Sequence, residues 1–116
     1  MEFEAEKAIY LQIADWIETK ILTGVWQERI PAIRELAAEV KVNPNTIARA
    51  YAYLEAQGAI TSQRGLGYFV AHEARDRILK ARKQIFLEKT VPQFLQSMRL
   101  LKVSFEELKA IAATFD

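Results

Sequence analysis

Three polar side chains in the middle of the sequence have the chemistry needed to read a nucleic acid. Asn45, Thr46 and Arg49 follow the pair Asn43-Pro44, which is typical of a helix start because Asn caps free backbone amides and Pro fits the first turn. On the exposed side of such a helix, Asn and Arg can each make bidentate hydrogen bonds to base edges, and Thr can reach a phosphate or a thymine methyl group. The stretch therefore predicts base contacts by a helix whose N-terminal end enters the major groove.

Two arginines elsewhere occupy positions where a phosphate would be favoured. Arg34 lies in the first turn of a predicted helix that Pro31 precedes, and the helix dipole favours an anion at that end. Arg64 lies in a turn with Gly65 and Gly67, which lets the backbone come close to a phosphate or to the minor groove. These separate segments could together present one polar and cationic surface.

Other chemistries find little support in the sequence. There is no Cys, and His72 is the only histidine, without a metal-ligand partner at helical spacing. Gly65-Leu66-Gly67 lies between two predicted strands rather than between a strand and a helix, which argues against a nucleotide-binding loop. The sequence therefore predicts no catalytic residue, no metal ligand and no cofactor. The simplest alternative for Asn45, Thr46 and Arg49 is a helix face that is only solvated.

Glycine, proline and apolar periodicity predict the elements that position these residues. Apolar residues recur at helical spacing from Ile9 to Ile21, Gly24 ends that helix, and a second helix covers residues 34–40. A third helix runs from Pro44 to Gln57 before Gly58. Two short strands follow, with a glycine-bearing turn between them at residues 63–67. The expected fold is mainly α with a small β-hairpin, a winged helix–turn–helix. The inward positions of the second and third helices are Leu36, Ala37, Val40, Ile47, Ala50, Tyr51 and Leu54.

The sequence after residue 72 is again helical and carries an apolar stripe. Pro92 is expected to kink or restart the helix. Ser104 and Glu107 have the spacing of a capping box, flanked by Val103 and Leu108 as a hydrophobic staple. So short a tail has too few residues to bury its own apolar stripe, and monomers rarely expose an apolar patch of this kind. We therefore expect a two-fold symmetric homodimer. The aromatic residues Phe86, Phe94, Phe105 and Phe115 could instead line a small-molecule pocket, an alternative that we favour less. The expected dimer residues are Ile85, Phe86, Phe94, Leu95, Met98, Leu101, Leu108, Ile111 and Phe115.

The positive charge of the chain is not concentrated in the half that holds the candidate nucleic-acid residues. The 116 residues include 16 Lys plus Arg and 15 Asp plus Glu, a net charge of +1. Residues 1–71 hold 7 basic and 9 acidic groups, net −2, whereas residues 72–116 hold 9 and 6, net +3. The half with the candidate nucleic-acid residues is thus the more acidic one, so we expect weak non-specific DNA affinity. No apolar run is long enough for a membrane helix and the start is acidic rather than signal-like, which favours the cytoplasm.

Residues 9–70 resemble the winged-helix domain of the GntR family of bacterial transcription regulators, and the short tail resembles the YtrA-type subfamily. The resemblance implies that Arg34 contacts DNA ahead of the recognition helix. It also implies that Asn43, Asn45, Thr46 and Arg49 read the operator, and that Arg64 and Gly65 form the wing tip. The matching segments are Pro31-Ala32-Ile33-Arg34-Glu35-Leu36-Ala37, Val42-Asn43-Pro44-Asn45-Thr46-Ile47-Ala48-Arg49-Ala50-Tyr51, Leu54-Glu55-Ala56-Gln57-Gly58 and Arg64-Gly65-Leu66-Gly67.

Two positions and one loop depart from the pattern that the resemblance sets. Ala32 stands where Ser is usual, which removes half of a capping box with Glu35, and Lys41 stands where Gly is common, so a left-handed backbone there would be strained. The loop at residues 26–30 is shorter than usual and lacks Pro-Gly. None of these positions reads bases, so they concern local geometry.

These observations lead to one expected function and one alternative. We expect a DNA-binding domain at residues 1–71 and a helical dimerisation element at residues 72–116. The homodimer, a transcription regulator and by subfamily resemblance a repressor, would bind a pseudo-palindromic operator. Each recognition helix (residues 44–57) would enter the major groove and each wing (residues 63–67) the adjacent groove. The alternative is a winged-helix protein–protein interaction module without DNA activity; a small-molecule effector is compatible with the sequence but not indicated by it.

Overall fold

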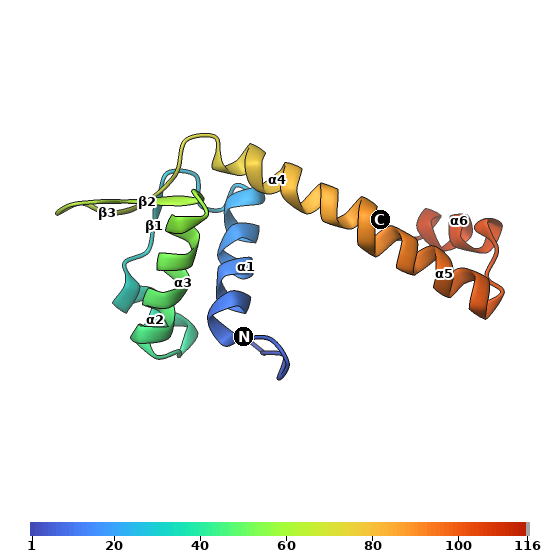
Figure 1. Ribbon diagram of the computed structural model, residues 1–116, viewed down its shortest axis with the longest axis horizontal. Coiled ribbons are helices and arrows are strands. Elements are labelled where there is room, and N and C mark those ends of the chain that lie inside the picture. The colour runs from blue at the N-terminus through green and yellow to red at the C-terminus, as the bar shows by residue number, and fades with distance from the viewer. Residues whose placement is uncertain (116) are drawn as a thin grey trace. The chain divides into compact units, whose positions relative to one another are not determined.

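The computed structural model describes residues 1–115 and is mainly helical with one small antiparallel sheet, as expected (Figure 1). The chain divides into two compact units, Met1–Leu79 and a second that begins at Lys80. The N-terminal unit extends past residue 71 because Ala74 and Ile78 are buried in its core. The elements are α1 (Ile9–Leu22), β1 (Arg29–Ile30), α2 (Ile33–Val40), α3 (Pro44–Ala56), β2 (Ile60–Gln63), β3 (Gly67–Val70), α4 (Ala74–Ile85), a π-helical turn η1 (Phe86–Thr90), α5 (Val91–Leu101) and α6 (Phe105–Ala113).

The core of the N-terminal unit is built by α1 and α2, which both pack against α3. At its centre, the buried Tyr51 of α3 donates its hydroxyl proton to the Pro31 carbonyl oxygen at 2.6 Å and meets the Tyr68 ring edge-on at 4.9 Å. Burial, with smaller contributions from Tyr68 and Glu35, raises the pKa of Tyr51 above the ordinary tyrosine value. One side chain thus ties α3 both to the segment before α2 and to β3. The buried helix positions confirm most of the predicted stripes, whereas Ile9 at the start of α1 is 47% exposed and Val40 is only half-buried at the end of α2. The buried members are Ile13, Ile17, Ile21, Leu36, Ala37, Ile47, Ala50 and Leu54.

The sheet confirms the predicted hairpin and adds a strand that the sequence analysis missed. β2 pairs antiparallel with β3 from Ile60 opposite Val70 to Gln63 opposite Gly67. β1 pairs with the other edge of β3, so the strand order is β1-β3-β2. The sequence predicts a loop around Arg29, because the two residues of β1 are too few to show an alternating pattern. Its buried residue is Ile30, which is 2% exposed.

Three helix boundaries follow from the residues predicted to set them. The Asn43 side-chain oxygen accepts a hydrogen bond from the Asn45 backbone N–H at 2.8 Å, which confirms Asn43 as the N-cap of α3. Lys41 ends α2 in the left-handed region with φ +57°, a conformation that costs an L-residue about 1–2 kcal/mol. Ala32 has the extended backbone of an N-cap but supplies no side-chain acceptor to α2. The substitutions at residues 32 and 41 therefore weaken both ends of one helix.

Restoring the missing cap should stabilise the protein. In Ala32→Ser, the new hydroxyl would accept the N–H of Glu35, so we expect the free energy of unfolding to rise by about 0.5–2 kcal/mol. Urea unfolding followed by circular dichroism measures this difference. Ala38→Ser, an exposed position later in the same helix, is the control and should give no gain. An equal effect of both variants would show that the start of α2 is not under-capped.

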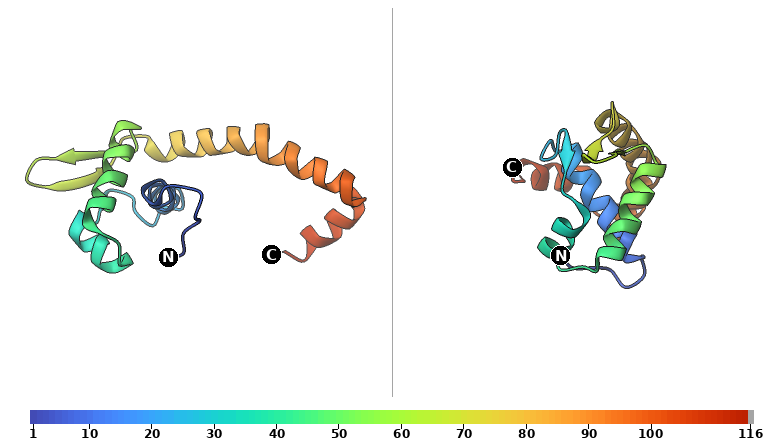
Figure 2. Two further views of the ribbon diagram at one scale, coloured as in Figure 1. Left: turned by 60° about the horizontal axis from the view of Figure 1, so that its bottom comes forward. Right: turned by 90° about the vertical axis from the view of Figure 1, so that its left-hand side faces the viewer.

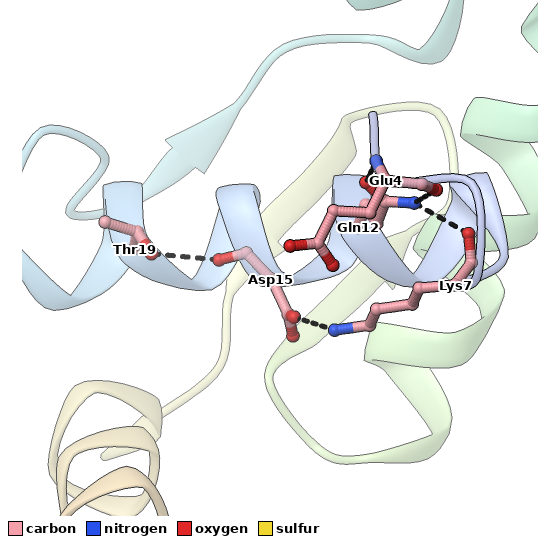
Figure 3. Close-up of polar contacts among 5 residues, drawn as sticks. All are labelled: Glu4, Lys7, Gln12, Asp15 and Thr19. Carbon is pink, nitrogen blue, oxygen red and sulfur yellow. Dashed lines mark hydrogen bonds and ion pairs between the residues drawn. The ribbon is translucent and has the colours of Figure 1, made fainter. Parts of the chain in front are cut away.

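The segment before α1 is held against that helix rather than frayed (Figure 3). The Gln12 amide accepts a hydrogen bond from the Glu4 N–H and donates to the carbonyl oxygens of Glu4 and Lys7, at 2.6–2.8 Å. Lys7 also forms an ion pair with Asp15. Because Ala8 offers α1 no side-chain cap, these contacts fix the start of the helix instead.

The C-terminal unit is a helix interrupted by a π turn and followed by a reversal into α6 (Figure 2). Pro92 follows the π turn, as expected for a residue that lacks an N–H and crowds the preceding turn. Lys102 adopts the left-handed conformation at the end of α5, and Ser104 and Glu107 form the predicted capping box. Of the expected dimer residues Met98 is 7% exposed, so it contributes to the interior of this unit.

Candidate nucleic-acid interface

The outward face of α3 presents the two residues with the strongest predicted chemistry. Asn45 and Arg49 are exposed and lie one helical turn apart, so their side chains point to the same side. Thr46 is half-buried at the edge of this face. Exposed Ala52 lies on the same face one turn further on, where its methyl group could meet a thymine methyl. The sequence alone does not point to Ala52, because an alanine carries no chemical signal of its own.

Asn43 has a structural task that limits what it can do at an interface. Its side-chain oxygen already accepts the Asn45 N–H, which leaves the amide N–H groups of this exposed side chain as donors to a base or phosphate. The structure thus brings Asn43 and Asn45 together, through a backbone contact that fixes the first turn of α3.

The arginine predicted to read bases is held by an aromatic side chain. The Arg49 guanidinium carbon lies over the Tyr10 ring of α1, 4.1 Å from its centroid. Within residues 1–115, none of the ion pairs involves Arg34, Arg49 or Arg64. The guanidinium charge of Arg49 is therefore available to an incoming anion or base edge.

The remaining predicted residues lie on separate elements. Arg34 is exposed in the first turn of α2, and Arg64 and Gly65 form the exposed tip of the β2–β3 hairpin, which extends beyond the helices (Figure 1). Gly65 has φ +76° and no atom within 4 Å of the place a Cβ would occupy. The backbone conformation, rather than crowding, therefore requires glycine there, as a tight wing tip demands.

A cation that the sequence analysis missed lies beside the hairpin. The Arg29 guanidinium of β1 lies 5.9 Å from the centroid of the Phe69 ring. It also comes within 3.4 Å of the position that a Cβ on Gly67 would occupy. No sequence pattern could place Arg29 beside the wing, because β1 pairs with a strand far along the chain. The wing therefore carries arginines both at its tip and at its flank.

The arrangement of α1–α3 and the three-stranded sheet defines a winged helix–turn–helix protein, with α3 as the helix that exposes polar side chains. Residues 9–70 match the family described as "Bacterial regulatory proteins, gntR family". The chain belongs to the GntR family of transcription regulators, with a DNA-binding domain.

Two relatives from Bacillus subtilis (strain 168) are similar over most of the chain. The uncharacterized HTH-type transcriptional regulator YhcF is 35% identical over 119 residues, which cover 98% of this chain and 94% of the relative. The HTH-type transcriptional repressor YtrA is 29% identical over 102 residues, which cover 86% of this chain and 78% of the relative. Both relatives are transcription regulators rather than enzymes.

Two solved structures share the fold. A GntR family transcriptional regulator from Listeria monocytogenes has a TM-score of 0.74 at 31% identity, and the match covers 98% of this chain and 100% of that one. The DNA-binding domain of AraR, in complex with operator ORR3, has a TM-score of 0.52 at 31% identity, covering 61% of this chain and 90% of that one. Across residues 1–115 of the present protein, no helix is long and apolar enough to cross a membrane.

Proposed function

We propose that this GntR-family regulator binds a pseudo-palindromic operator as a homodimer, with the recognition helix (residues 44–57) in the major groove and the wing (residues 63–67) in the adjacent groove. The observation that carries the proposal is the exposed pair Asn45 and Arg49 on one face of α3. Both side chains have bidentate geometry for base edges. The similarity to the AraR domain solved with its operator supports the same use of the domain here.

Dimerisation is proposed from the apolar side chains that the C-terminal unit leaves uncovered. Phe94 is 48% exposed and Phe115 is 87% exposed. The surface of a partner protomer would cover these apolar side chains and remove them from water. We assign DNA contact to residues 1–71 and dimerisation to residues 72–116, apart from Ala74 and Ile78, which belong to the core of the N-terminal unit. Two-fold symmetry would then present one recognition helix to each half-site of the operator. Exposed members of the predicted seam are Ile85, Phe86, Phe94, Leu95, Leu101, Ile111 and Phe115, and Leu108 is half-buried.

Repression is the proposed direction of regulation, supported by the similarity to the repressor YtrA over 86% of the chain. A dimer bound across a promoter would occlude the polymerase without any further activity. This role places the protein in the cytoplasm with the bacterial chromosome. A small-molecule effector forms no part of the proposal.

Selection of bound DNA from fragmented genomic DNA tests the proposal most directly. The wild-type chain should enrich fragments that share a two-fold symmetric sequence. Binding to such a fragment should survive excess competitor DNA, because base contacts add specificity to phosphate attraction. Enrichment of no sequence would instead support the protein–protein interaction module.

Arg64 at the wing tip is expected to act mainly through the attraction of its positive charge to DNA phosphates or to the negative potential of the groove. Arg64→Ala should therefore weaken operator binding by less than Arg49→Ala does. It should also reduce the slope of log affinity against log salt concentration by about two, one for the wing of each protomer. A fluorescence anisotropy titration across a salt series measures both values. The matched control is Leu66→Ala at the same exposed tip, which removes no charge and should leave the salt slope unchanged; an unchanged slope in Arg64→Ala would exclude a phosphate contact.

A further inference from the structure

Tyr10, a residue with no assigned role in DNA recognition, lies against the arginine that carries the strongest predicted base contact. The 4.1 Å between the Arg49 guanidinium carbon and the Tyr10 ring centroid is well within the range of about 6 Å for a cation–π interaction. The Tyr10 ring is half-buried and packs against the core. The contact therefore joins a flexible cationic side chain to a ring that is anchored on another helix.

A second aromatic residue fixes the orientation of this ring. Tyr53 lies one turn after Arg49 on α3 and meets Tyr10 with ring centroids 6.1 Å apart and an interplanar angle of 72°. Such edge-to-face packing is a preferred arrangement for two aromatic rings. Two residues of α3 that lie one helical turn apart, Arg49 and Tyr53, therefore contact the Tyr10 ring and restrict the rotation of the Tyr10 side chain.

The position of Tyr10 along the chain is also defined. It lies in the first turn of α1, whose start is held by the Gln12 bonds to Glu4 and Lys7 (Figure 3). The ring is therefore presented to Arg49 from a helix start that is fixed by hydrogen bonds.

We propose that Tyr10 is a positioning residue for Arg49, which holds the guanidinium by its face and leaves its N–H edge free for a guanine. The proposal rests on the proposed function, in which Arg49 reads a base edge. A guanidinium stacked on a ring keeps its planar set of donors available, and a side chain already ordered in the free protein loses less freedom on binding. Tyr10 itself makes no contact with DNA in this proposal.

Two substitutions of Tyr10 separate the ring face from the hydroxyl and from simple packing. Tyr10→Phe keeps the ring and should bind the operator fragment selected by the wild type with unchanged affinity. Tyr10→Leu keeps apolar volume but removes the ring, and should weaken binding by about two- to fivefold at each half-site, the loss of one exposed cation–π contact in each protomer. Equal affinity of Tyr10→Leu and the wild type would overturn the proposal, as would a loss in Tyr10→Phe equal to that in Tyr10→Leu.

A double-mutant cycle shows whether Tyr10 acts through Arg49. Adding Tyr10→Leu to Arg49→Ala should cause no further loss of affinity, because the residue to be positioned is already gone. A further loss of the same size in the double variant would mean that Tyr10 supports the fold or binding independently, and would overturn the positioning role.

A measurement on the free protein tests the stack without DNA. The Arg49 side-chain N–H resonance should show an upfield ring-current shift in the NMR spectrum of the wild type and Tyr10→Phe, and lose it in Tyr10→Leu. Absence of that shift in the wild type would overturn the proposal whatever the variants do. If the wild type shows the shift but selects no DNA, the proposed function fails while the stack itself stands.

Discussion

The Arg49→Ala variant is expected to lose about 1–3 kcal/mol of operator binding at each half-site, which is about a five- to 150-fold higher Kd per half-site. The reason is that Arg49 is exposed on the outward face of α3, unpaired by any carboxylate of residues 1–115. Asn45→Ala, which removes the other bidentate side chain of this face, should lose a similar amount. Specificity at the contacted base pair should relax in both variants, and titration with a panel of single-base operator variants measures this.

A charge-matched control separates base reading from general attraction to DNA. Arg99→Ala removes the same charge from an exposed position of α5 and should leave operator specificity unchanged. If Arg49→Ala, Asn45→Ala and Arg64→Ala all bind the operator as tightly as the wild type does, the proposed surface is wrong.

Disrupting the apolar seam of the C-terminal unit should have the largest effect of all. Phe94 is half exposed in the single chain, so Phe94→Glu should leave each protomer folded while placing a charge in the proposed interface. The variant should be monomeric at micromolar concentration by size-exclusion chromatography with light scattering. Its operator affinity should fall by about 100-fold or more, because the two half-sites are no longer engaged together.

The control for this variant lies on the opposite side of the same helix. Leu100 is 80% exposed and points away from the stripe formed by Phe94, Leu95 and Leu101. Leu100→Glu should therefore remain dimeric and retain full operator affinity. A wild-type protein that is itself a stable monomer at micromolar concentration would contradict the homodimer.

The parts of the fold that the sequence predicted well are those with local signals. Asn43 and Pro44 mark the start of α3, Ser104 and Glu107 mark the start of α6, and the glycines of the wing mark the hairpin. Each of these signals acts within a few residues, so spacing alone reveals it. The strand β1 could not be predicted from local signals because its two residues are defined only by pairing with β3.

The same difference between local signals and long-range contacts applies to the residues of the candidate site. The helical period correctly places Asn45 and Arg49 on an exposed face, since burial of the opposite face determines it. The stack of Arg49 on Tyr10 and the packing of Arg29 on Phe69 join residues that are far apart in the sequence. Tertiary contacts of this kind leave no periodic pattern, and here they decide how two arginines are oriented.

The π turn before Pro92 also sets the angular phase of the apolar stripe. A π turn takes up one residue more than an α turn, which sets the following helix back by about 100°. In an uninterrupted helix Phe86 and Phe94 would lie about 80° apart around the axis, whereas the extra residue of η1 brings them within about 20° of each other. Deleting one residue from 87–90 should therefore convert the π turn into a regular α turn and keep Phe86 and Phe94, then seven residues apart, within about 20° of each other. The same residues in an uninterrupted helix would be about 80° out of alignment, so the pairing geometry of the protomers would depend on the helix type of η1 as well as on residue identity.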